Sequence, residues 1–139
     1  MHHLHLIHTD LKPDNIHFAS SEYKKVLYYK NGLKRLSQHG ICYMRSPKLT
    51  GIKFIDFGSA TFEDQNHSSI ISTRNYQEPE VILGLGWSYP ADVWSIGCIL
   101  VELCARKTLF QTHENMEHLA MMERVLGPCP QHMIRKADA

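Results

Sequence analysis

The segment HTDLKPDNIHF at residues 8–18 places a histidine, two aspartates, a lysine and an asparagine around a proline turn, directly before a short apolar run. Further along the chain, DFG at residues 56–58 follows a second apolar run, and EPE stands at residues 78–80. The first segment fits the scheme H-x-D-L-x-x-x-N. Each motif alone is weak, but the three in this order indicate one site.

These residue types suit phosphoryl transfer, in which the protein mainly positions the acceptor hydroxyl and neutralises charge on the phosphates. Asp10 can accept the hydroxyl proton, and Lys12 can neutralise the transferred phosphate. Asn15 and Asp56 offer the oxygen ligands that Mg²⁺ prefers, while Gly58 allows the turn that follows. The alternative is that these side chains only cap turns in a surface loop.

The composition gives no strong hint of a partner. The chain has 139 residues, with 15 Lys and Arg against 14 Asp and Glu, a formal net charge of +1. This balance predicts no direct binding to nucleic acid and no attachment to a membrane surface. The four cysteines form no C-x-x-C pair, which predicts reduced thiols in an intracellular protein. The longest apolar run, at residues 93–101, is far shorter than the roughly 20 residues of a membrane span, so we expect a soluble protein.

The first half of the chain predicts little regular structure. We expect the end of a helix at residues 1–7, because Leu4 and Ile7 are spaced to share a face. Short strands are expected at residues 16–18 and 52–55, the second of them buried. They would pair across an exposed insertion at residues 19–51, with a hairpin around Asn31-Gly32.

The second half predicts helices, so the fold class is α+β. Residues 56–80 are polar and irregular and are expected to form a long loop, of the sort that is usually functional or disordered. A helix begins at Pro90 and is apolar nearly all round, so we expect it to be buried on most sides. Another helix is expected over residues 114–126, with Thr112 as its N-cap and Gly127-Pro128 as its stop.

Ten histidines raise the question of a zinc site. HENMEH at residues 113–118 resembles the zinc motif H-E-x-x-H, but His113 and His118 are five positions apart. On a helix they would lie roughly 140° apart and could not reach one ion. The histidines at residues 2–8 have no fixed ligand spacing. A specific zinc site is therefore not expected.

EHLAMMER at residues 117–124 is the signature of the LAMMER, or CDC-like, protein kinases. The segments HTDLKPDN, DFGSA and STRNYQEPEVILGLGWSYPADVWSIGCILVEL also resemble that family, and the wording is nearest to its plant-type branch. EHLAMMER also fits an amphipathic core helix, and both interpretations can hold together. The resemblance implies a partial protein kinase domain over residues 1–139, reaching from the catalytic loop to the LAMMER helix. Its lobe would be mostly helical, with a short β-hairpin that carries the catalytic and DFG loops.

The resemblance assigns roles to individual residues. Asp10 would be the catalytic aspartate, and Lys12, Asn15 and Asp56 would bind ATP and Mg²⁺, with His17 under the adenine ring. The other implied positions are Thr73 and Arg74 in the substrate-binding segment, and His8, Phe57, Gly58, Glu80 and Asp92 as structural support.

The activation segment contains four hydroxyls that are candidates for phosphorylation: Ser68, Ser69, Ser72 and Tyr76. For each serine the alternative is a solvated loop hydroxyl. Thr9 stands where most kinases have the arginine that receives a loop phosphate, so gating by loop phosphorylation is weakly supported. LAMMER kinases share this threonine.

Other positions depart from the family pattern. His17 replaces the apolar residue under the adenine ring, and Gln77 and Glu78 replace an arginine and an alanine. A carboxylate at Glu78, if buried without a partner, would be costly. No G-x-G-x-x-G loop and no strand lysine precede residue 8, and GLGWSY at residues 84–89 lacks the third glycine. We therefore expect the N-terminal lobe and the final helices of the C-terminal lobe to be absent.

Two hypotheses follow. The first is ATP-dependent phosphoryl transfer to serine, threonine or tyrosine of proteins such as arginine-serine-rich splicing factors, with a nuclear location implied and a cytoplasmic one open. The second is a truncated, non-catalytic fragment that acts at most as an interaction module. We expect the isolated chain not to catalyse, because losing one electrostatic donor alone commonly costs about 10²- to 10³-fold in rate. The sequence leaves the substrate and the oligomeric state open.

Overall fold

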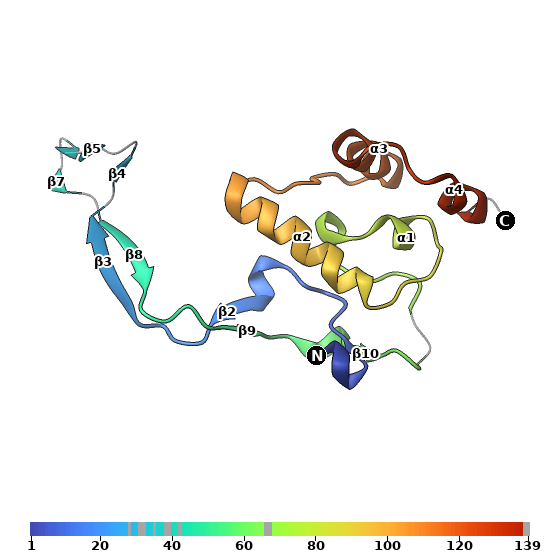
Figure 1. Cartoon of the computed structure of the whole chain (residues 1–139), viewed down its shortest axis with the longest axis horizontal. Helices are drawn as coiled ribbons and strands as arrows, with labels where there is room; N and C mark the ends of the chain where they lie inside the picture. The colour runs from blue at the N-terminus through green and yellow to red at the C-terminus, as the bar shows by residue number, and fades with distance from the viewer. Residues whose placement is uncertain are drawn as a thin grey trace. The chain divides into compact units, whose positions relative to one another are not determined.

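Figure 1 shows the computed structural model of the chain, which describes residues 1–27, 29–30, 33–34, 36–37, 40–41, 43–65 and 68–137. Its contacts divide the chain into two compact units. The first unit comprises Met1–Asn15 and Asp56–Ala139, and the second comprises Ile16–Ile55. The second unit thus contains the predicted insertion together with the two strands that flank it.

Within the second unit, β2 (Ile16–Phe18) pairs antiparallel with β9 (Ile52–Phe54). This pairing confirms the predicted strands. The prediction that the second strand is buried is wrong, because Ile52 is 55% exposed, and Phe18 at the facing position is 58% exposed. Two strands of three residues are too short to bury both faces of a sheet without further layers.

The insertion folds into an antiparallel ribbon. Strand β3 (Tyr23–Leu27) pairs with β8 (Tyr43–Pro47), side by side in Figure 1. Asn31-Gly32 lies outside the described residues, although the strands on either side of it do pair. The further short strands of the insertion are β4 (Tyr29–Lys30) with β5 (Leu33–Lys34), and β6 (Leu36–Ser37) with β7 (Gly40–Ile41).

The N-terminus of the first unit is a 3₁₀ turn and a strand. The turn η1 (His2–Leu4) is followed by β1 (Leu6–Ile7), which pairs with β10 (Thr61–Phe62). The expected helix end at residues 1–7 is therefore wrong, and Leu4 is 61% exposed while Ile7 is fully buried. Pairing with a distant strand has overridden the local helical spacing.

The loop expected at residues 56–80 contains several short elements. They are η3 (Phe57–Ser59), β10, η4 (Arg74–Tyr76) and the first residues of α1 (Pro79–Ile82). Outside this loop, one more 3₁₀ turn, η2 (Pro13–Asn15), lies within the motif at residues 8–18. The described part of residues 56–80 thus holds short 3₁₀ turns and one short strand at its two ends, with irregular chain between Phe62 and Arg74.

The helix α2 (Pro90–Ala105) begins with Pro90 in its first turn, as predicted. It is buried on one face, through residues such as Asp92 and Ile99. On other faces Val93 is 61% and Leu103 is 65% exposed. The expectation that this helix is buried on most sides is therefore wrong.

Two more helices complete the first unit (Figure 1). They are α3 (Asn115–Leu126) and α4 (Gln131–Ala137). The predicted helix at residues 114–126 is confirmed, but its N-cap is Glu114 rather than Thr112. Thr112 Oγ1 instead accepts a hydrogen bond from the Glu114 N–H at 3.2 Å.

The core of the first unit forms where α2 and α3 meet the segment between them. Phe110 is 1% exposed, and its ring stacks on Trp94 of α2 at a centroid distance of 6.1 Å. His118 of α3 lies against the same ring at 5.5 Å. Among the residues that the structure describes, no helix has the length and hydropathy needed to cross a bilayer.

Candidate functional site

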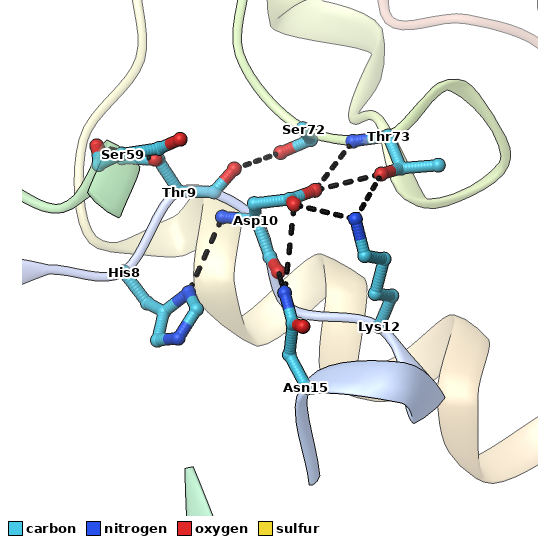
Figure 2. Close-up of polar contacts among 8 residues, drawn as sticks. All are labelled: His8, Thr9, Asp10, Lys12, Asn15, Ser59, Ser72 and Thr73. Carbon is cyan, nitrogen blue, oxygen red and sulfur yellow. Dashed lines mark hydrogen bonds and ion pairs between the residues drawn. The ribbon is translucent and has the colours of Figure 1, made fainter. Parts of the chain in front are cut away.

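The carboxylate of Asp10 is the centre of a hydrogen-bond network (Figure 2). Thr73 donates to Asp10 Oδ1 twice, from its backbone N–H at 3.0 Å and from its hydroxyl at 2.7 Å. Lys12 Nζ lies 2.7 Å from Asp10 Oδ2 and donates also to Thr73 Oγ1 at 3.2 Å. The network therefore joins the first motif to a loop 63 residues further along the chain.

These contacts set the charge state of the site. Burial alone would raise the pKa of Asp10, but the hydrogen bonds from Lys12 and Thr73 outweigh it and lower the pKa below its ordinary value. The hydrogen bond to Asp10 raises the pKa of Lys12. At neutral pH the site thus holds a carboxylate and an ammonium group side by side. The Asp10 side chain is still 21% exposed, so a hydroxyl can reach it.

Asn15 is oriented by the same segment. Its side chain is 5% exposed, and Nδ2 donates to the Asp10 carbonyl oxygen at 2.9 Å. With the amide nitrogen turned toward the backbone, the other end of the amide, Oδ1, is the atom offered to a ligand. An amide oxygen is the donor that a hard cation such as Mg²⁺ requires, so Asn15 fits the predicted metal.

Asp56 opens the DFG turn with a left-handed backbone, at φ 61°. A Cβ on Gly58 would lie 3.3 Å from Asp56 Oδ1, which is tighter than most contacts of that kind. Because Gly58 has no side chain, the Asp56 carboxylate can keep its position without crowding. The described residues hold no group of three or more His, Cys, Asp and Glu side chains that could bind a metal ion. Mg²⁺ commonly takes one or two protein ligands and completes its shell with phosphate and water, so two oxygens suffice.

Asp92 fixes the backbone just before Asp10. It is 2% exposed on α2, and its oxygens accept hydrogen bonds from the N–H groups of His8 at 2.9 Å and Thr9 at 3.0 Å. His2 Nε2 lies 2.9 Å from the same carboxylate. The His8 ring packs against Phe57 at 5.0 Å, which links this segment to the DFG turn.

Three residues of the site have strained backbones that the sequence motifs did not reveal. Thr9, Asp56 and Ser72 all have positive φ, at 68°, 61° and 65°. Such conformations cost about 1–3 kcal/mol each and persist only where surrounding contacts hold them. The Thr9 hydroxyl donates to the Ser59 carbonyl, and the Ser72 hydroxyl donates to the Thr9 carbonyl, both at 2.8 Å (Figure 2).

The loop after Thr73 is tied to two helices. Arg74 Nη1 donates to Asn115 Oδ1 at the start of α3 at 2.7 Å, and the Tyr76 hydroxyl donates to Glu102 of α2 at 2.7 Å. Burial and the hydrogen bond to Glu102 raise the pKa of Tyr76. Sequence reasoning missed Asn115 and Glu102: both lie within segments quoted for the family resemblance or the zinc motif, but neither was assigned a role.

The candidate phosphorylation sites differ in accessibility. Ser68 and Ser69 are exposed, whereas Tyr76 is 7% exposed. The interpretation of Ser72 as a solvated hydroxyl is wrong, because it bonds to Thr9. Beside these residues lies a hollow of about 470 Å³, lined by Asp10, Thr73, Ser72 and Ser68 among others. A hydroxyl that enters this hollow meets the Asp10 carboxylate.

Two further predicted positions belong to other elements of the chain. His17 is an exposed residue of β2, in the second unit, opposite Lys53. Glu80 is on α1 and lines a hollow of about 510 Å³ together with Glu78 and Trp94. Glu78 is 3% exposed, and neither of its oxygens has a hydrogen-bond partner among the described residues. Burial, with Glu80 and Asp92 nearby, raises the pKa of Glu78 to about 7.

Comparison with known proteins agrees with this geometry. The family model of the protein kinase domain matches residues 1–136. Over 99% of the length of this chain, it is 64% identical to the serine/threonine-protein kinase AFC2 of Arabidopsis thaliana. Over 98% of the length of this chain, it is 57% identical to the dual specificity protein kinase CLK4 of Homo sapiens. It spans 32% and 26% of those relatives.

A crystal structure of a kinase domain matches the fold with a TM-score of 0.84 and 47% identity, covering 98% of this chain and 39% of that one. This match confirms the predicted fold class, and the named relatives confirm the resemblance to LAMMER and CDC-like kinases. The chain therefore belongs to the protein kinase domain family, as a segment of its LAMMER-type branch.

Proposed function

We propose that this chain is the hydroxyl-activating part of a protein kinase that transfers the γ-phosphate of ATP to serine and threonine, and also to tyrosine, of protein substrates. The single observation that carries the proposal is the Asp10 carboxylate, kept ionised and oriented by Lys12 and two bonds from Thr73. A positioned carboxylate beside an open hollow is what a general base for an alcohol requires.

Each residue of the site has a task in this proposal. Mg²⁺-ATP, when bound, supplies the phosphate and neutralises part of its charge. Asp10 orients the acceptor hydroxyl and takes its proton, while Lys12 places a positive charge at the same point. Asn15 and Asp56 would hold Mg²⁺ through oxygen atoms. Thr73 fixes the direction of the Asp10 carboxylate and at the same time joins it to the substrate-binding segment.

The substrate class and the location rest on the family. We propose arginine-serine-rich splicing factors as substrates and the nucleus as the place of action, because the relatives of this chain include AFC and CLK kinases. The proposal also gives His17 a place under the adenine ring. It gives Thr73 and Arg74 a place against the protein substrate.

Nucleotide binding is the first test. The thermal unfolding of the 139-residue chain would be measured with and without Mg²⁺-ATP, beside Asp56→Asn and the control Asp64→Asn, which removes an exposed carboxylate of the same unit. At nucleotide tenfold above Kd, binding stabilises the folded state by about 1.4 kcal/mol. We expect the shift in wild type and Asp64→Asn, and its loss in Asp56→Asn. A cooperative transition that is indifferent to nucleotide would contradict the proposal.

Asp10→Asn separates binding from hydroxyl activation. Because Asp10 acts on the hydroxyl, this variant should keep the nucleotide-dependent shift in melting temperature. Any transfer of phosphate to an arginine-serine repeat peptide should fall by about 10²-fold or more, the size expected for loss of a general base. Measurable transfer that is equal in wild type and Asp10→Asn would exclude Asp10 as the base.

A further inference from the structure

The two units of the chain carry net charges of opposite sign, although the net charge of the whole chain is close to zero. Residues 16–55 contain eight of the 15 Lys and Arg residues but one of the 14 Asp and Glu residues, a formal net charge of +7. The rest of the chain therefore carries −6. The single acid, Glu22, already has a partner, because Lys48 Nζ lies 3.1 Å from its Oε2.

Two cations face each other across the ribbon of β3 and β8. Lys25 stands directly opposite Arg45 in the register of this pair. Residues directly opposite lie on the same face of a sheet, and like charges there are destabilising. Both side chains are exposed, and no carboxylate stands on the ribbon. An anion between the two cations would remove the repulsion.

Two tyrosines share that face with the cations. Side chains alternate along a strand, so Tyr23 projects on the same side as Lys25, and Tyr43 on the same side as Arg45. Tyr23 is 41% exposed and Tyr43 is 57% exposed. The Arg45 guanidinium lies over the Tyr23 ring, 4.7 Å from its centroid. We call Tyr23, Lys25, Tyr43 and Arg45 the basic aromatic face.

The base of this face borders a hollow within the second unit. Its volume is about 440 Å³, and Tyr23 and Arg45 line it together with Ser20, Ser21 and Glu22, whose carboxylate is paired with Lys48. The serine hydroxyls can donate to phosphate oxygens, and the ring and guanidinium present flat surfaces. Figure 1 shows β3 and β8, the two paired strands that carry the face, side by side.

We propose that the basic aromatic face binds single-stranded nucleic acid. Its cations would contact successive phosphates, and its exposed tyrosine rings would stack on unpaired bases, which is how proteins bind single strands without sequence preference. A duplex hides the faces of its bases, and a phosphorylated peptide uses only the cations and leaves the rings without a role. The proposal departs from the expectation drawn from the overall charge, because that charge averages over both units.

The test measures binding of a fluorescein-labelled uridine RNA, about 12 nucleotides long, to the full 139-residue chain by fluorescence anisotropy. Affinity should fall about tenfold between roughly 50 and 200 mM salt, because released counterions carry much of the binding. Lys25→Glu should weaken binding about tenfold. Lys24→Glu is the matched control, since it makes the same charge change one residue away, on the opposite face.

The tyrosine variants separate stacking from charge. Tyr43→Ala should weaken binding about fivefold or more, while Tyr43→Phe keeps the ring and should bind as wild type. Tyr43 is more than half exposed, so neither variant is expected to unfold the chain. A phosphoserine peptide of the same net charge as the RNA should bind more weakly than the RNA.

Several outcomes would overturn the proposal. Equal loss from Lys24→Glu and Lys25→Glu would mean general attraction to a positive unit rather than one face. A Tyr43→Ala variant that binds as wild type, with the phosphoserine peptide binding as tightly as the RNA, would assign the face to phosphorylated protein. Absence of RNA binding at the lower salt concentration would refute it directly.

Discussion

Two buried carboxylates lie in the same unit and have opposite surroundings. Asp92 is 2% exposed and accepts hydrogen bonds from the backbone of His8 and Thr9. Glu78 is 3% exposed, and its oxygens have no partner among the described residues. A buried carboxylate that receives donors organises the backbone around it, whereas one without donors destabilises its own charged form. Equal burial therefore says nothing about whether a charge supports the fold.

Removing Asp92 should have the largest effect. In Asp92→Ala, two buried backbone N–H groups lose their acceptor, and we expect the free energy of unfolding to fall by about 2–5 kcal/mol. Urea denaturation of the 139-residue chain would measure this. Asp92→Asn keeps one acceptor oxygen and should lose less. An Asp92→Ala variant as stable as wild type would show that water replaces the carboxylate.

Replacing Glu78 should have the opposite sign and a smaller size. Its pKa is raised to about 7 from an ordinary 4.5, so the folded state holds its proton more tightly than the unfolded state. The stability that comes from this proton is full below pH 4.5 and is lost as the pH rises to about 7. Above that pH, Glu78→Gln should therefore be more stable than wild type by about 1–3 kcal/mol.

Thermal unfolding of wild type and Glu78→Gln between pH 5 and 8 would check this prediction. Glu78→Ala restores the residue that the family pattern has at this position and is the second variant. The gap between wild type and variant should widen as the pH rises. A gap that is constant with pH would mean that Glu78 has a partner in solution.

His118 extends the comparison of Asp92 and Glu78 to a basic side chain. It is fully buried, and both ring nitrogens are without a partner among the described residues. Burial, and then the Arg74 charge, lower its pKa. The neutral ring is compatible with the fold above pH 6.5, and stability is lost as the pH falls below that value through the lowered pKa.

His118→Phe removes this titration and keeps a ring against Phe110. We expect the variant to lose less stability than wild type on acidification from about pH 6.5 to 5, by about 1 kcal/mol. Melting temperatures at the two pH values would measure the difference. Equal losses in both proteins would show that the ring is not titrated in this range.

The smallest effect concerns the exposed cations. Lys25→Glu replaces a like-charge pair with an opposite-charge pair facing Arg45, and should stabilise the chain by a few tenths of a kcal/mol. Lys24→Glu, which faces Ser46, should give no such gain. Chemical denaturation of both variants would compare them. Lys25→Glu should also weaken RNA binding. If this variant binds RNA more weakly but is more stable than wild type, unfolding cannot explain the loss of affinity.

Prediction from sequence succeeded where the information is local. The strands around the insertion and the helices beginning near Pro90 and Asn115 follow from apolar spacing and from proline and glycine positions. It failed at residues 1–7, where β10 recruits Leu6 and Ile7 into a strand pair. It also failed for α2, because spacing shows which residues are apolar and does not show how many neighbours will cover them.

By itself, the sequence determined the motif order, the family and the residue types of the site, because Asp10, Lys12 and Asn15 stand within six positions of one another. Only the tertiary structure decided how they are held. Thr73 reaches Asp10 across 63 residues and Asp92 reaches His8 across 84, while Thr9 takes a left-handed backbone that its β-branched side chain disfavours. Contacts of that range depend on the packing of whole helices and loops, and no local pattern encodes them.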